Sequence, residues 1–127
     1  MPGSFADSNV VLYALTIGSK AERAWEILRT RPTINVQVLH VLRLKQRLTW
    51  AEIEERMGLI RELLPERDLT VRVHDLGRAM AAHHGFRTYD AMIVAAALDA
   101  GCATLWSEDM QDGMVVVGQL TIRNPFQ

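Results

Sequence analysis

Three aspartates occupy positions where a carboxylate could take part in chemistry. Asp7 ends a short apolar stretch and is followed by two residues that favour a helix start. Asp90 lies in the first turn of a strongly apolar segment, and Asp109 follows another short apolar stretch. Carboxylate oxygens suit hard cations such as Mg²⁺ and Mn²⁺, with water completing the shell. A cation held in this way could polarise a phosphodiester and activate water for its hydrolysis.

The elements predicted from the sequence would bring these aspartates together. Strands are predicted at 4–7, 33–36 and 103–106 and within 114–122, with an extended stretch at 69–71; helices are predicted from 8–9 onward, at 20–30, 38–47, 50–64 and 88–100, and in the segment that ends at Gly85. This alternation indicates a three-layer α/β/α fold with a mostly parallel central sheet. Parallel strands end, and the helices after them begin, at one edge of the sheet, where such folds bind ligands.

Local signals fix where several helices begin and end. Thr49–Glu52 forms a capping box, and the apolar stripe of the helix that follows ends before Pro65. Gly85 is predicted to close a later helix, because glycine readily adopts the left-handed conformation found there. Thr88 is predicted to cap the next helix, which is apolar on nearly all sides and should therefore be buried.

Each aspartate also has a purely structural alternative. Asp7 and Asp90 both stand where a helix begins, and a carboxylate there stabilises the helix by about 0.3–1 kcal/mol. Asp109 belongs to the polar stretch 108–113 and could be a solvated turn residue. The coincidence of all three at one sheet edge is what favours a functional site.

Composition limits the class of protein. The chain has 127 residues, a net charge of −1, 49% apolar and 23% charged residues, which fits one domain spanning 1–127. The chain has no overall positive charge that would indicate a nucleic-acid partner, so RNA binding would depend on local groups. Cys102 lies in an apolar segment and is predicted to be a buried thiol. We expect a cytoplasmic protein without a membrane span, because no signal peptide is evident and the longest apolar run, Ala91–Leu98, is too short.

Four segments of the chain resemble PIN-domain VapC-like toxins. They are Phe5–Val10, Tyr89–Ala97, Leu105–Gly113 and Leu120–Phe126. The similarity follows the order of the chain and covers nearly its whole length. It implies a PIN-like fold, endoribonuclease activity dependent on Mg²⁺ or Mn²⁺, an RNA substrate, a cognate antitoxin as partner and a homodimer.

The resemblance also assigns roles to individual residues at the predicted edge. Metal ligation and catalysis fall to Asp7, Asp90 and Asp109, accessory ligation to Asp112, and support of the site to Ser8, Asn9 and Ser107. Within this set, Ser8 and Asn9 are expected to orient Asp7.

One departure from the family pattern concerns the second acidic position. The family carries a glutamate in the helix after its second strand, whereas this chain reads Gln37–Arg43 there and has no acid between Glu26 and Glu52. The helix is shorter by roughly four residues, about one turn, which would keep its apolar face in phase. His40 could stand in as a ligand, although imidazole suits Mn²⁺ or a softer ion better than Mg²⁺.

Three functional hypotheses follow. The first is a divalent-metal-dependent endoribonuclease whose activity is weakened by the missing glutamate. The second is a catalytically impaired PIN-fold module that acts through dimerisation and antitoxin binding, with the first helices and Trp50 contributing to a groove. This second hypothesis is favoured if neither Glu108 nor Asp112 completes the acidic site. The third is an unrelated α/β ligand-binding domain.

Overall fold

The central sheet has four strands. It is seen in a computed structural model that describes residues 3–16, 18–35 and 48–127, so the helix predicted at 38–47 lies outside the described residues. The strands are β1 (Ser4–Ala6), β4 (Thr104–Trp106), β6 (Leu120–Arg123) and β5 (Val115–Val116), in the order β1-β4-β6-β5. β4 pairs in parallel with β1 and β6, while the edge strand β5 runs antiparallel to β6.

Two further strands extend this arrangement on the side of β1. β2 (Ile34–Asn35) and β3 (Glu66–Arg67) form a parallel pair, and a bridge between Phe5 and Thr33 joins the pair to β1. The extended stretch predicted at 69–71 is wrong in position. The strand lies earlier, and the Thr70 hydroxyl accepts a hydrogen bond from the Val73 backbone and so starts a helix at Val71.

Five helices cover the sheet within the described residues. They are α1 (Ser8–Ala14), α2 (Ala21–Leu28), α4 (Trp50–Leu63), α5 (Val71–His84) and α6 (Thr88–Asp99). The predicted capping box is confirmed, because Thr49 and Glu52 exchange side-chain and backbone hydrogen bonds at the start of α4. Gly85, at φ 72°, ends α5 as predicted. Thr88 is not the cap of α6, since the helix begins with Thr88 itself and follows Arg87, whose side chain makes no capping bond.

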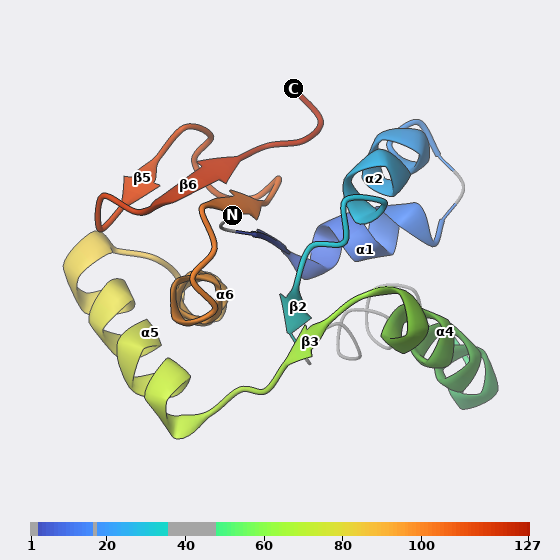
Figure 1. The fold of residues 1–127 in the computed structure, drawn as a ribbon, viewed down its shortest axis with the longest axis horizontal. Helices are drawn as coiled ribbons and strands as arrows, with labels where there is room; N and C mark the ends of the chain where they lie inside the picture. The colour runs from blue at the N-terminus through green and yellow to red at the C-terminus, as the bar shows by residue number, and fades with distance from the viewer. Residues whose placement is uncertain (1–2, 17, 36–47) are drawn as a thin grey trace.

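The helices form a layer on each side of the sheet (Figure 1). Phe5, Leu105 and Ile122 pack with α5 and α6 in one buried core, and Ala6 packs with α1, α2 and α4 in another. Residues 91–97 of α6 are all buried, which confirms it as the central helix. The predicted three-layer α/β/α fold with a mostly parallel sheet is confirmed. Cys102 is buried as predicted, and no described helix is both long and apolar enough to cross a membrane.

A strained turn joins β5 to β6. The Gln119 backbone donates to the Val116 carbonyl at 3.1 Å, and the two residues between them, Val117 and Gly118, have φ of 54° and 63°. This is the pattern of a type I′ hairpin turn, which favours Asn-Gly. A β-branched residue at positive φ is strained, and Val117 is also 62% exposed.

Val117→Asn should therefore stabilise the protein. We expect the free energy of unfolding to rise by about 1 kcal/mol, because asparagine tolerates the left-handed conformation at little cost. Urea unfolding followed by circular dichroism measures the change. The matched control is Val115→Asn, since Val115 is 58% exposed but belongs to a strand, where valine is favoured. Equal or lower stability of Val117→Asn would contradict the assignment of strain.

Candidate metal centre

Strand pairing places the first aspartate beside the end of β4. Ala6 and Trp106 are register partners in the parallel β1–β4 pair, and each strand ends there. Asp7, the residue before α1, donates its backbone N–H to the Trp106 carbonyl at 2.9 Å. Ser107 is therefore held next to Asp7 at the carboxyl edge of the sheet, which is the edge that the sequence predicts.

Asp7 is a buried carboxylate, with 3% of its surface exposed. The Ser107 hydroxyl donates to Asp7 Oδ2 at 2.9 Å. Burial raises the Asp7 pKa to about 6 from its ordinary 3.8; the hydrogen bonds from Ser107 and the Ser8 backbone oppose the increase, and the charges of Asp90 and Asp109 add to it. The electrostatic influence of Asp90 and Asp109 places both of them in the neighbourhood of Asp7.

Asp90 belongs to the same cluster from the opposite layer. It lies in the first turn of α6, and burial followed by the charge of Asp109 raises its pKa, while Arg87 acts in the other direction. The structure thus brings Asp7, Asp90 and Asp109 into mutual repulsion. We call these three residues the acidic cluster.

Two polar side chains at the start of α1 reach the other parts of the acidic cluster. The Ser8 hydroxyl lies 3.2 Å from the Tyr89 hydroxyl, and Asn9 donates its side-chain N–H to Asp109 Oδ2. Ser8 acts on Asp7 through its backbone N–H. The side chains of Ser8 and Asn9 therefore connect α1 to the neighbours of Asp7. Tyr89 belongs to a segment that resembles the family, but the sequence analysis gives it no role at the site.

Glu108 is turned toward a different set of partners. Lys20 Nζ lies 2.5 Å from Glu108 Oε1. Burial alone would raise the pKa of Glu108, but hydrogen bonds with Lys20 and Tyr13 and the charge of Lys20 lower it overall. Lys20 also sits over the rings of Tyr13 and Phe126, at 4.8 and 5.4 Å from their centres. The Glu108 carboxylate is thus neutralised by a lysine.

Asp112 holds the C-terminal segment. Its Oδ1 accepts the Asn124 backbone N–H at 2.8 Å, and Arg23 Nε donates to the Pro125 carbonyl at 2.8 Å farther along the same segment. Asp112 thus serves a structural contact, and its accessory ligation stays a prediction. His40 and the rest of Gln37–Arg43 lie outside the described residues.

The donor set fits a hard divalent cation in its chemistry. It consists of carboxylate oxygens whose charges repel one another, and burial raises the pKa of Asp7 although hydrogen bonds from Ser107 and Ser8 offset part of the effect. The side chains are not closed into a cage, since no group of three His, Cys, Asp or Glu among the described residues is arranged to hold a metal ion.

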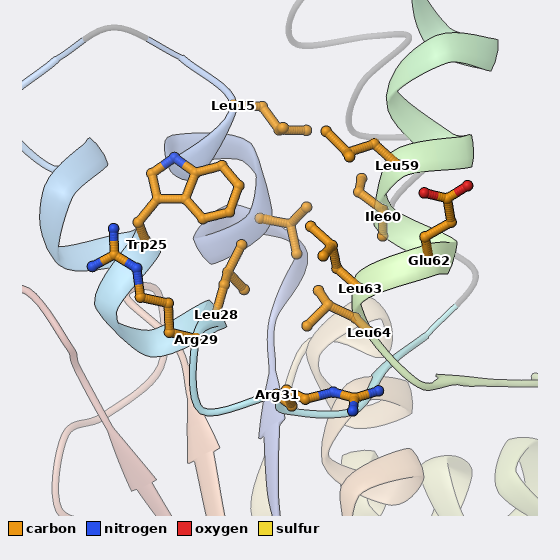
Figure 2. A pocket seen from close by; sticks show the side chains of 11 residues that line it. Leu15, Trp25, Leu28, Arg29, Arg31, Leu59, Ile60, Glu62, Leu63 and Leu64 are labelled. Carbon is orange, nitrogen blue, oxygen red and sulfur yellow. The ribbon is translucent and has the colours of Figure 1, made fainter.

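A second feature is an apolar groove of about 330 Å³ between α1, α2 and α4. Figure 2 shows Leu63 of α4 and Leu64, the residue that follows α4, pointing toward Leu28 of α2. Arg29 and Arg31 line the groove at the end of α2, and Glu62 lies on α4. We call this the α1–α2–α4 groove. The second hypothesis placed the first helices at a groove, and residues of α1 and α2 do line this one; Trp50, named with them, does not line it.

Comparison with known proteins adds to this geometry. No family profile and no curated protein sequence matches the chain. Solved structures do match. A toxin–antitoxin complex from Klebsiella pneumoniae aligns with a TM-score of 0.74 at 15% identity, over 97% of this chain and 98% of that one. VapC20 of Mycobacterium tuberculosis, described as a Sarcin-Ricin loop cleaving toxin, aligns with a TM-score of 0.67 at 13% identity. The alignment covers 84% of this chain and 90% of VapC20. VapBC2 of Rickettsia felis bound to promoter DNA aligns with a TM-score of 0.66 at 16% identity. The alignment covers 95% of this chain and 97% of that one.

The fold and the sheet edge define a class. This chain is an α/β/α protein of the PIN-like type with aspartates gathered where its parallel strands end. More particularly, it has the fold of the VapC toxins. At 13–16% identity the likeness is one of fold.

Proposed function

We propose that this protein is a divalent-metal-dependent endoribonuclease of the VapC toxin type. The observation that carries the proposal is the acidic cluster, in which Asp7, Asp90 and Asp109 repel one another at the strand-end edge. Such a cluster is stable when a cation screens it. The fold shared with a toxin described as cleaving the Sarcin-Ricin loop supports RNA as the substrate.

The residues of such a site have two roles, cation binding and orientation of the carboxylates. Asp7, Asp90 and Asp109 would be the ligands of Mg²⁺ or Mn²⁺, which when bound supplies Lewis-acid polarisation of the phosphodiester and a more acidic water. Ser107 fixes one oxygen of Asp7, and Asn9 fixes one oxygen of Asp109, so both carboxylates are oriented before a ligand arrives. Hydrolysis in this arrangement would leave a 5′-phosphate on the cleaved RNA.

The number of acids sets an expectation for the rate. Glu108 pairs with Lys20 through Oε1, and Asp112 accepts the Asn124 backbone N–H through Oδ1, so each of these acids already has one other partner. We infer an activity below that of a site with the usual glutamate, and one that is higher with Mn²⁺ than with Mg²⁺, because Mg²⁺ demands a nearly ideal octahedral geometry.

The test is cleavage of a structured RNA pool with Mg²⁺ or Mn²⁺ by the parent and by Asp90→Asn. We expect the variant to lose at least about 100-fold in rate, since even the hydrogen-bonding partners of metal ligands are typically worth 10- to 100-fold in affinity or activity. Asp75→Asn, an exposed α5 aspartate paired with Arg78, is the matched control and should cut like the parent. Equal cutting by the parent and Asp90→Asn would end the carboxylate hypothesis.

The α1–α2–α4 groove favours a second function, that of an antitoxin-binding module. An apolar channel between helices fits the apolar face of a partner helix, and Arg29 and Arg31 would pair with acids beside that face. The Klebsiella pneumoniae structure is a toxin–antitoxin complex. We propose a cognate antitoxin as the occupant, with a homodimer of this cytoplasmic chain as the binding unit.

The two functions are separable by experiment. A folded parent protein that cuts no RNA with either cation but binds the antitoxin would be a binding module whose nuclease site is impaired. A protein that does both would be a complete toxin, and its antitoxin would control it.

A further inference from the structure

The hydrogen bond between Ser8 and Tyr89 joins two helices at the point where they present carboxylates. Ser8 is the first residue of α1 and Tyr89 the second of α6, and their hydroxyl oxygens lie 3.2 Å apart. Ser8 follows Asp7 directly in the chain, and Tyr89 precedes Asp90 directly. The hydroxyls therefore meet within one residue of two members of the acidic cluster.

This hydrogen bond is partly buried. Ser8 is 2% exposed, and Tyr89 is half-buried. A hydrogen bond in such surroundings is stronger than one in water, and losing one partner leaves a buried hydroxyl unsatisfied. The two residues belong to opposite layers of the fold, so the contact spans the sheet edge.

The contact acts against a force that the acidic cluster creates. Asp7 and Asp90 repel each other, and this repulsion pushes the first turns of α1 and α6 apart. A cation would pull both carboxylates back, but only after the helix ends have come within reach. A hydrogen bond that holds the two helix ends together beforehand lowers the cost of assembling the ligands.

We propose that Tyr89 is a positioning residue, which through its hydrogen bond to Ser8 holds α1 and α6 at the spacing that lets Asp7 and Asp90 share one cation. The inference rests on the proposed metal site and adds a residue to it. Tyr89 acts here through Ser8 and the helix ends and does not ligate the cation.

The experiment measures Mn²⁺ binding to the intact protein by electron paramagnetic resonance. The variants are Tyr89→Phe, Ser8→Ala and the double variant. Each single variant should raise the Kd for Mn²⁺ by about 10-fold. The double variant should raise it by the same factor, because one hydrogen bond cannot be lost twice. Tyr13→Phe removes a hydroxyl outside the acidic cluster and should bind Mn²⁺ like the parent. Unchanged affinity in either single variant, or a product of the two effects in the double variant, would overturn the proposal.

A second measurement separates this proposal from the metal site itself. It is amide hydrogen exchange in the metal-free protein. The Val10 N–H donates a hydrogen bond to the Asp7 carbonyl in the first turn of α1, and the Ala91 N–H donates one to the Arg87 carbonyl in the first turn of α6. Tyr89→Phe should speed exchange of both amides several-fold and leave the Ala100 amide, at the far end of α6, unchanged. No binding by the parent would refute the proposed function, whereas unchanged exchange at Val10 and Ala91 would refute the role of Tyr89.

Discussion

Asp7→Asn should give a protein that is more stable than the parent at pH 8 and no longer cleaves RNA. Ionised Asp7 is buried among like charges, which is why its pKa lies at about 6. Asparagine removes the charge and can still accept the hydrogen bond that Ser107 donates to Asp7 Oδ2. It also keeps a favourable residue before α1.

The pH dependence has a definite sign. Below the ordinary pKa of 3.8 the carboxyl group is protonated in both folded and unfolded chains, so its charge costs nothing. Between 3.8 and about 6 the unfolded chain loses its proton first, and stability falls as pH rises. Above 6 the full penalty of roughly 3 kcal/mol applies, at about 1.4 kcal/mol per pKa unit.

Urea unfolding in the presence of a chelator at pH 5 and pH 8 measures this effect. The advantage of Asp7→Asn should be larger at pH 8, and addition of Mn²⁺ should stabilise the parent more than the variant. An Asp7→Asn protein that is less stable than the parent at pH 8 would mean that the ionised carboxylate is compensated within the protein. RNA cleavage by the same two proteins, assayed without urea or chelator and with Mg²⁺ or Mn²⁺ present, links the lost activity to the gained stability.

The second large effect is expected in the α1–α2–α4 groove. The double variant Leu59→Lys/Leu63→Lys should weaken binding of the purified cognate antitoxin by at least about 100-fold, because it removes two apolar anchors and places charge in an apolar channel. Leu59 is 45% exposed and Leu63 is 44% exposed, so the isolated protein should fold with lysine at both positions. Isothermal titration calorimetry measures the affinity.

A matched control introduces two lysines at exposed apolar positions outside the groove. Leu69→Lys/Val71→Lys introduces the same charges at exposed apolar residues, 41% and 78% exposed, that do not line the groove. This protein should bind the antitoxin like the parent. Equal losses in both double variants would show that added charge, and not the groove, decides affinity. RNA cleavage by Leu59→Lys/Leu63→Lys should persist when the antitoxin is present.

Much of the fold and the location of the acidic cluster follow from the sequence. Alternating strands and helices predict a parallel sheet, and a parallel sheet gathers strand ends and helix starts at one edge. That topological argument needs no knowledge of side-chain conformations, which is why it placed Asp7, Asp90 and Asp109 together. Their roles as ligands remain predictions.

The partners of individual side chains could not be predicted in the same way. Whether Glu108 faces the acidic cluster or Lys20 depends on the path of a loop and on where α2 begins, and single positions in the sequence do not record either. Tyr89 received no role of its own, because its contact with Ser8 joins residues 81 positions apart and no local pattern records such a contact. The strand predicted at 69–71 failed because Thr70 competes for the backbone as a helix cap.

Pairing of β1 with β4 has a consequence for the newly made chain. Asp7 and Ser107 stand 100 positions apart, as do Asn9 and Asp109. A nascent polypeptide leaves the ribosome with its first residues ahead, so β1 must wait for β4 to emerge before it gains this neighbour. Parallel pairing over such separations is slow to form. An unfinished chain that stops before β4 would therefore carry Asp7 without the residues that orient it, and the acidic cluster can form only when synthesis is nearly complete.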